Sequence, residues 1–260
     1  MYLFFLLFLS ILPVFLVGFY IYNKDNDKEP LILLAKLFLG GVCACVLTLI
    51  LSFALSAIFP RLMESETDLS LIELFFRVFF CIALIEEGSK WIFTYNIAFY
   101  DKEFDQVYDM LVYSVFVSLG FACVENVFYV LDGGVYTAVI RALTAIPGHA
   151  CFGVFMGYYL ALSKLSILHG NINLKKKNML LSIFVPVLLH GIYDYFLLSG
   201  SVLFIVLCLI LIIALYITVF KRIKKISSIY GKMKYKDNYC PNCGRRVLSA
   251  YCPTCGRKNE

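Results

Sequence analysis

Acidic, basic and polar residues interrupt segments of the chain that are otherwise apolar. These residues are of the kinds found in the active sites of hydrolases. Carboxylates and imidazoles can take a proton from water and return it to a leaving group, and both are zinc ligands. Peptide hydrolysis also needs stabilisation of the oxyanion that forms at the attacked carbonyl. These residues therefore form a candidate catalytic set. In chain order they are Glu86, Glu87, Glu125, His149, His190 and Asp194, with Lys90 and Asn126 in supporting roles.

The spacing of this set suits helices that share one polar space. Glu86 and Lys90 are four residues apart, as are His190 and Asp194, so each pair lies on one face of a helix. At a rise of about 1.5 Å per residue, the whole set falls in one layer, in the middle to outer half of a bilayer. A charge at the bilayer centre costs roughly 2.5–3.5 kcal/mol. The set is therefore predicted to line a shared cavity, to form ion pairs or to hold a cation.

The elements that carry these residues are predicted to be membrane-spanning helices. Of 260 residues, 61% are hydrophobic and 16% are charged, against roughly 45–50% and about 25% in soluble domains. The mean hydropathy is +0.83, which excludes a disordered chain and a soluble enzyme with an ordinary surface. The long apolar runs predict an all-α polytopic membrane protein with about seven transmembrane helices. The runs are 1–22, 31–59, 71–99, 107–131, 137–162, 179–198 and 202–220.

Several residues in and around these runs carry expectations about packing. The first run lacks a basic region and a small-residue cleavage site, so it is predicted to be an uncleaved helix. Pro147 is expected to kink the fifth run, and Gly153 and Gly157 are expected to let that helix approach a neighbour closely. Arg141, near a span end, is expected to snorkel or to pair across helices. His169 is expected at the surface, in a polar loop.

Basic residues are concentrated in alternate loops, and this pattern predicts the orientation. By the positive-inside rule, the N-terminus lies outside and the C-terminus lies in the cytoplasm. We therefore expect a multi-pass plasma-membrane protein, with the bacterial inner membrane as its location. Anionic lipid accounts for the basic residues after the last run, so no nucleic-acid partner is expected. The basic loops carry Lys24, Lys28, Lys102, Lys164, Lys175, Lys176, Lys177 and the cluster that begins at Lys221.

The C-terminal tail has the cysteine spacing of a structural zinc site. Two Cys-x-x-Cys-Gly pairs can supply four thiolates in a tetrahedron, whereas a redox dithiol normally needs one such pair. The predicted organisation is therefore a transmembrane domain over 1–220, a basic linker over 221–237 and a small cytoplasmic zinc ribbon over 238–260, which would dock a cytoplasmic protein partner. The ligands would be Cys240, Cys243, Cys252 and Cys255.

Four short motifs, in order on successive hydrophobic runs, resemble the PrsW family of intramembrane proteases. That family belongs to a wider superfamily with the CAAX prenyl endopeptidases and bacteriocin-immunity-type membrane proteins. The resemblance covers roughly 71–198 and implies an endopeptidase that cleaves a membrane protein, with an anti-sigma factor as substrate. Glu125-Asn126 and the spacing of Lys90 depart from the CAAX branch, which argues against a prenyl substrate. The motifs are Glu86-Glu87-x-x-Lys90, Phe121-x-x-x-Glu125-Asn126, Pro147-Gly148-His149 and His190-x-x-x-Asp194.

The roles within the set have alternatives at this point. Either Glu86 or Glu87 can act as the base, and the resemblance favours Glu86. A purely glutamate-based mechanism and one that uses a catalytic zinc are both consistent with the residues, since two histidines and a carboxylate meet the three-ligand requirement of such a zinc. The expected ligands for that metal are Glu125, His149, His190 and Asp194.

Two non-enzymatic functions are also consistent with buried ionisable residues. One is an ion or proton pathway, and the other is a membrane scaffold that presents the zinc ribbon. A pathway would distribute carboxylates across the membrane depth, whereas these residues are predicted to lie in one layer with two histidines. A scaffold leaves the buried acids unexplained. An intramembrane protease is therefore the preferred interpretation.

Overall fold

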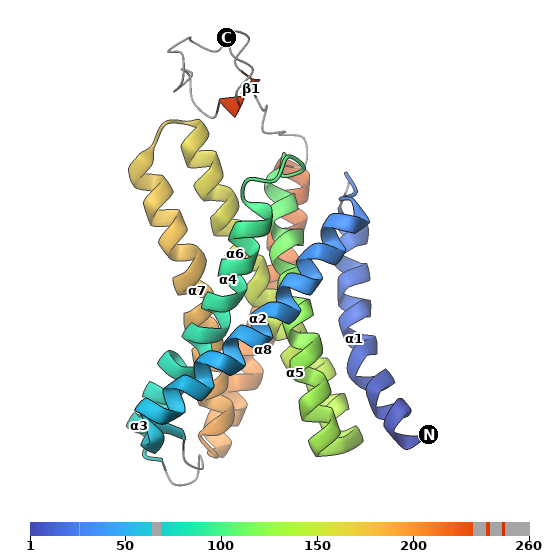
Figure 1. Cartoon of the computed structure of the whole chain (residues 1–260), viewed down its shortest axis with the longest axis vertical. Helices are drawn as coiled ribbons and strands as arrows, with labels where there is room; N and C mark the ends of the chain where they lie inside the picture. The colour runs from blue at the N-terminus through green and yellow to red at the C-terminus, as the bar shows by residue number, and fades with distance from the viewer. Residues whose placement is uncertain (26, 64–68, 231–237, 240–245, 248–260) are drawn as a thin grey trace.

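The protein is almost entirely helical in the residues that the structure describes. A computed structural model describes residues 1–25, 27–63, 69–230, 238–239 and 246–247 (Figure 1). The strands β1 (Asn238–Tyr239) and β2 (Arg246–Val247) pair antiparallel. The four tail cysteines lie outside the described residues, so the zinc ribbon and the division into domains remain predictions. The helices are α1 (Tyr2–Lys24), α2 (Leu31–Ile58), η1 (Pro60–Met63), α3 (Leu71–Phe76), η3 (Arg77–Ala83), α4 (Leu84–Ala98), α5 (Val107–Leu143), α6 (Ala145–Leu168), α7 (Ile172–Leu198) and α8 (Val202–Tyr230).

Several of these helices are long and apolar enough to cross a membrane. Five such segments occur in the described residues: α1, α2, Val107–Ile167, α7 and Val202–Ile223. The segment Val107–Ile167 extends over both α5 and α6. Large apolar side chains are exposed along α1, α2 and α8, as contact with lipid requires. The prediction of an all-α membrane protein is confirmed, while the count of seven crossings and the orientation stay predictions.

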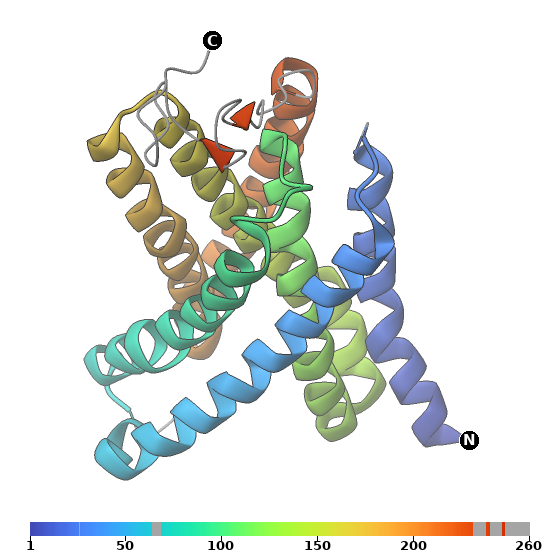
Figure 2. The ribbon, with the colours of Figure 1, turned by 45° about the horizontal axis from the view of Figure 1, so that its top comes forward.

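Helix α5 is deeply buried over its first half, and it contacts α1, α2 and α6. Helix α2 runs obliquely across α4 and α5 (Figure 2). The predicted close approach through small residues is confirmed, with α5 as the neighbour. A Cβ on Gly157 would lie 2.3 Å from the carbonyl oxygen of Met110, and one on Gly153 would lie 2.7 Å from Oγ of Ser118. Any larger side chain at these positions would push the two helices apart.

Helix α5 reverses direction near its end, so that residues 135–143 run back along it. The reversal occurs at Gly134, whose φ of 70° and ψ of −159° belong to a region that only glycine adopts readily. We call residues 135–143 the returning segment. Ala138 of this segment packs with Val130 of α5 and Leu6 of α1. The sequence predicted a loop at about 132–136, but not that the chain after it would fold against α5.

The returning segment ends at Thr144, so the fifth run is interrupted in the turn before Pro147, as expected of a proline that frees a carbonyl and kinks a helix. Thr144 has φ −121° and ψ −69°, and α6 begins at the next residue. Pro147 is therefore in the first turn of α6, where backbone amides have no intrahelical acceptor and proline removes no hydrogen bond. The carbonyl of Leu143, four residues before Pro147, cannot accept from a proline nitrogen. It accepts instead from the Tyr216 hydroxyl of α8 at 2.6 Å.

The third predicted run forms one continuous helical rod, α3–η3–α4, with wider turns in its middle. It begins with a capping box between Ser70 and Glu73, as helix N-termini favour. Residues Arg77–Ala83 have π-helical turns, which are rare and are often found at functional sites. The residues of this stretch do not predict these turns, because neither glycine nor proline occurs in it. Glu86 and Glu87 follow in the first turn of α4.

Candidate active site

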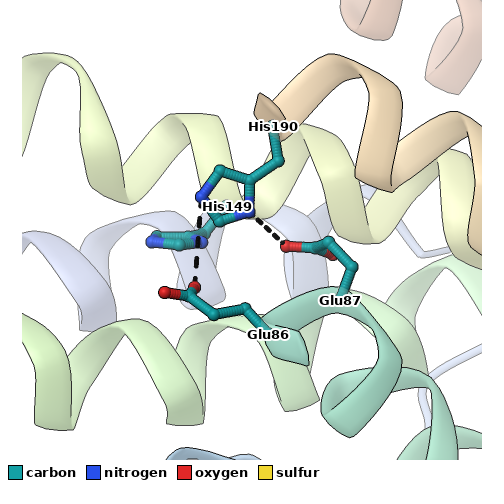
Figure 3. Close-up of side chains that lie close together, drawn as sticks. All are labelled: Glu86, Glu87, His149 and His190. Atoms are coloured by element: carbon teal, nitrogen blue, oxygen red, sulfur yellow. Dashed lines mark hydrogen bonds and ion pairs between the residues drawn. The ribbon is translucent and has the colours of Figure 1, made fainter. Parts of the chain in front are cut away.

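Four side chains from three helices meet in the interior of the bundle. Glu86 and Glu87 come from α4, His149 from α6 and His190 from α7 (Figure 3). One ligating atom from each lies within 4.8 Å of those from the others. We call these four residues the inner group. Up to 104 residues of sequence separate its members, so the group exists only because the helices pack as they do.

Lys90 places a positive charge against the inner group. Its Nζ lies 2.7 Å from Oε1 of Glu87 and 3.4 Å from Oε2 of Glu86. It is also 3.0 Å from Nδ1 of His149 and 4.0 Å from the centre of the Phe121 ring. The side chain has no exposed surface. A buried charge is tolerated only when it is paired, and the α4 spacings of three and four residues bring both glutamates to this ammonium.

The second nitrogen of His149 contacts Glu125 of α5. Nε2 of His149 lies 2.8 Å from Oε2 of Glu125. The same oxygen accepts a hydrogen bond from Nη2 of Arg141 at 2.8 Å, while Nε of Arg141 donates to Oδ1 of Asn126 at 2.8 Å. Arg141 thus pairs across helices, which was one of its two expected behaviours, but the sequence did not place it at the site.

His190 bridges the other acids of the site. Its Nδ1 lies 3.0 Å from Oε1 of Glu87. Its Nε2 lies 3.3 Å from Oδ2 of Asp194 and 4.0 Å from Oε2 of Glu86. The imidazole stacks on Phe152, with ring centres 5.0 Å apart. Both imidazole nitrogens therefore face a carboxylate, and stacking restricts rotation of the ring.

The grouping of carboxylates differs from the ligand set expected from sequence. That set paired the two histidines with Glu125 and Asp194. In the structure, Glu86 and Glu87 complete the inner group, whereas Glu125 and Asp194 contact His149 and His190 from outside it. Depth along a helix can be estimated from the residue count, but which carboxylate lies innermost depends on how each helix is rotated.

The inner group has the chemistry of a metal site. Two carboxylates and two imidazoles offer the oxygen and nitrogen donors that zinc takes in catalytic sites. Oε2 of Glu87 is buried and has no hydrogen-bond partner in the described part of the chain. Such an unsatisfied carboxylate oxygen is unfavourable in a protein interior unless a ligand meets it. The residues present therefore fit a bound metal ion.

The site is buried on one side and slightly open on the other. The side chains of Glu87 and Lys90 are completely buried. In contrast, Glu86 has 12% of its side chain exposed, Asp194 16% and Glu125 20%. Water can thus reach Glu86 but not Glu87.

Comparisons with known proteins decide the family. A protein-family model described as "PrsW family intramembrane metalloprotease" matches residues 29–220 of this chain. The chain belongs to the PrsW family. It is 35% identical over 216 residues to Protease PrsW of Oceanobacillus iheyensis, covering 83% of this chain and 93% of that protein. Identity is 32% over 213 residues with Protease PrsW of Clostridioides difficile (80% and 85% covered). It is 34% over 183 residues with Protease PrsW of Bacillus subtilis (70% and 78% covered).

PrsW membership confirms the predicted enzyme class, an intramembrane endopeptidase. The family is described as metalloproteases, and the inner group is the candidate site for the metal. No solved structure matches the chain. The match to the PrsW model ends at residue 220, so the tail with its four cysteines lies outside it.

Proposed function

We propose that the inner group is the catalytic centre with which this PrsW-family protein hydrolyses a peptide bond of a membrane protein. The observation that carries the proposal is the convergence of four ligating atoms within 4.8 Å, contributed by three apolar helices. Glutamate and histidine in a lipid environment are costly, and helix packing alone does not need them together. Their position gives water a polar site inside the bundle.

Glu87, His149 and His190 would hold the metal ion, which leaves Glu86 for proton transfer. When bound, zinc lowers the pKa of a water molecule and polarises the substrate carbonyl. Glu86 suits the role of base because it is the carboxylate of the α4 pair that is partly exposed, at 12% against 0% for Glu87. In this role it takes a proton from the attacking water and delivers it to the leaving amine.

The remaining residues orient this centre. Lys90 holds Glu87 through its short ion pair. Asp194 contacts Nε2 of His190, and a carboxylate on the far nitrogen of a ligating imidazole fixes its tautomer and its orientation. These positioning interactions matter because small displacements in an active site cost rate steeply.

The proposal extends to the substrate of the protein and to its location in the cell. We place the cleavage site within or near the outer membrane boundary of the substrate, because the candidate residues were predicted to lie in the middle to outer half of the bilayer. An anti-sigma factor is the substrate class that the family resemblance implies. The bacterial plasma membrane is the proposed location, with the N-terminus outside and the tail, as a zinc ribbon, available to a cytoplasmic partner.

Cleavage of a panel of single-span substrates by purified protein in detergent tests this proposal. Glu86→Gln, Glu87→Gln, His149→Ala and His190→Ala should each lower the cleavage rate by about 10²–10⁴-fold while the protein still folds. His169→Ala is the matched control, because His169 caps α6 in an exposed position away from the inner group. Normal cleavage by all four variants would refute the assignment.

A further inference from the structure

Arg141 is a charged residue beside the candidate centre that the proposed chemistry does not use. It lies on the returning segment, between the reversal at Gly134 and the interruption at Thr144. Only 14% of its side chain is exposed. Because the returning segment runs antiparallel to α5, Arg141 faces residues that precede it by 15 and 16 positions.

The Arg141 guanidinium joins the returning segment to α5 at several points. Nη2 donates to Glu125 and Nε donates to Asn126, both at 2.8 Å, and the guanidinium carbon lies 4.1 Å from the centre of the Tyr129 ring. Asn126 is held in turn, because its Nδ2 donates to the backbone carbonyl of Ser10 in α1 at 2.7 Å. The cation thus has a fixed geometry, anchored by two helices.

The hydrogen-bond directions around His149 identify its tautomer. The Lys90 ammonium can only donate, so Nδ1 of His149 accepts at 3.0 Å and carries no proton. In a neutral imidazole the proton is then on Nε2, which donates to Glu125 at 2.8 Å. Glu125 Oε2 receives this bond and the bond from Arg141 together. The lone pair of Nδ1 consequently points towards Lys90, beside the inner group.

We propose that Arg141 is a positioning residue, which holds Glu125 against Nε2 of His149 and thereby fixes the orientation of this imidazole beside the catalytic centre. This inference rests on the proposed role of His149. Glu125 lies on the open side of the site, with 20% of its side chain exposed. Without Arg141 its carboxylate is free to turn towards water, and Nε2 of His149 loses the acceptor that holds the ring in place.

An arginine is needed here because two acceptors must be held at once. The planar guanidinium presents several donors in a rigid fork, whereas a lysine ammonium is a single charge on a flexible stem. Arg141→Lys therefore keeps the charge but cannot hold Glu125 and Asn126 in the same geometry. Arg141→Gln removes the charge as well.

Nitrogen NMR of the full-length protein labelled with ¹⁵N-histidine gives a readout that does not depend on cleavage. The chain has three histidines, so the spectrum is simple, and single substitutions of His169 and His190 assign it. In the wild type, His149 should show a proton on Nε2 and none on Nδ1. Both Arg141 variants should shift the Nε2 signal of His149, because its acceptor Glu125 is no longer held in place, with His169 unchanged.

Cleavage kinetics form the second readout. Loss of a residue that supports a metal-ligating histidine typically costs 10–100-fold, and here it should appear in kcat, with KM within about twofold. Arg61→Gln is the control, since it removes an arginine whose ion pair with Glu73 is exposed and lies outside the site. It should leave both the His149 signal and kcat unchanged.

An unchanged His149 spectrum in Arg141→Lys would overturn the proposal. A kcat of Arg141→Lys as high as that of the control Arg61→Gln would overturn it too. Arg141→Lys decides the outcome if Arg141→Gln does not fold, because it retains the buried charge. The two hypotheses fail separately. Full activity of Glu86→Gln and His190→Ala would refute the catalytic centre, whereas the Nε2 signal of His149 would still report whether Arg141 positions Glu125.

Discussion

At the scale of single residues, the charge of Lys90 determines whether Glu87 can exist as a buried carboxylate. Lys90→Met leaves Glu87, which has no exposed side-chain surface, without its closest cation. Removing one partner of a buried ion pair typically costs about 3–5 kcal/mol. We therefore expect a clear drop in the thermal stability of the purified protein.

Lys102→Met is the matched control, because its pair with Glu103 is exposed and should contribute less than about 1 kcal/mol. Equal stability of the two variants would show that the Lys90–Glu87 pair is not a charged pair.

A second residue-scale prediction concerns Glu29, in the turn between α1 and α2. Burial raises its pKa from 4.5 to about 7; a hydrogen bond from the Tyr113 hydroxyl opposes this rise, and the nearby carboxylates of Asp25, Asp105 and Glu103 add to it. The unfolded chain thus releases this proton at lower pH than the folded protein does. The contribution of Glu29 to stability is therefore fully present below pH 4.5 and is lost as the pH rises to about 7.

Glu29→Gln removes this titration and should flatten the corresponding part of the stability profile. Between pH 4.5 and about 7, the wild type should lose up to about 1.4 kcal/mol per pH unit relative to the variant. Above this window the difference should stay constant. Thermal melts of both proteins across pH 4–8 measure it. A constant difference throughout the range would contradict a raised pKa at Glu29.

At the scale of elements, the reversal at Gly134 determines where Arg141 lies. Gly134→Ala places a side chain at φ 70° and ψ −159°, which costs about 1–3 kcal/mol or forces the reversal to change. Because the returning segment carries Arg141, both stability and cleavage should fall, with cleavage reduced about 10-fold or more. Gly200→Ala is the control: Gly200 also has a positive φ, of 68°, but it follows α7 away from the site, so only stability should fall. Normal cleavage by Gly134→Ala would show that the returning segment does not contribute to catalysis.

The sequence predicted how deep each functional residue lies but not which residues face one another. Depth follows from a fixed rise per residue, so the shared layer of Glu86, His149 and His190 could be estimated by counting. Rotation about the helix axis depends on packing and on local irregularities such as the π-helical turns at 77–83, for which the residues give no signal. The position of Arg141 depends on one backbone conformation at Gly134. The Gly133-Gly134 pair is the feature of the sequence that indicates this reversal.

At the scale of the whole molecule, the catalytic centre and the tail are predicted to function as separate units. The inner group is formed by α4, α6 and α7, and the match to the PrsW family ends before the four tail cysteines. Deleting residues 238–260 should therefore leave cleavage by the purified protein within about twofold, since no residue assigned to the centre is lost.

The same deletion separates the two expected zinc sites. Full-length protein should contain one more zinc per chain than the shortened protein, because a four-cysteine site is closed and structural. Metal analysis of both proteins, and of a full-length Cys240→Ser/Cys243→Ser variant, measures this difference. The metal that remains after deletion should be lost in His149→Ala. Equal zinc content before and after deletion would refute the ribbon, whereas loss of cleavage on deletion would show that the tail contributes to the catalytic unit and not only to partner binding.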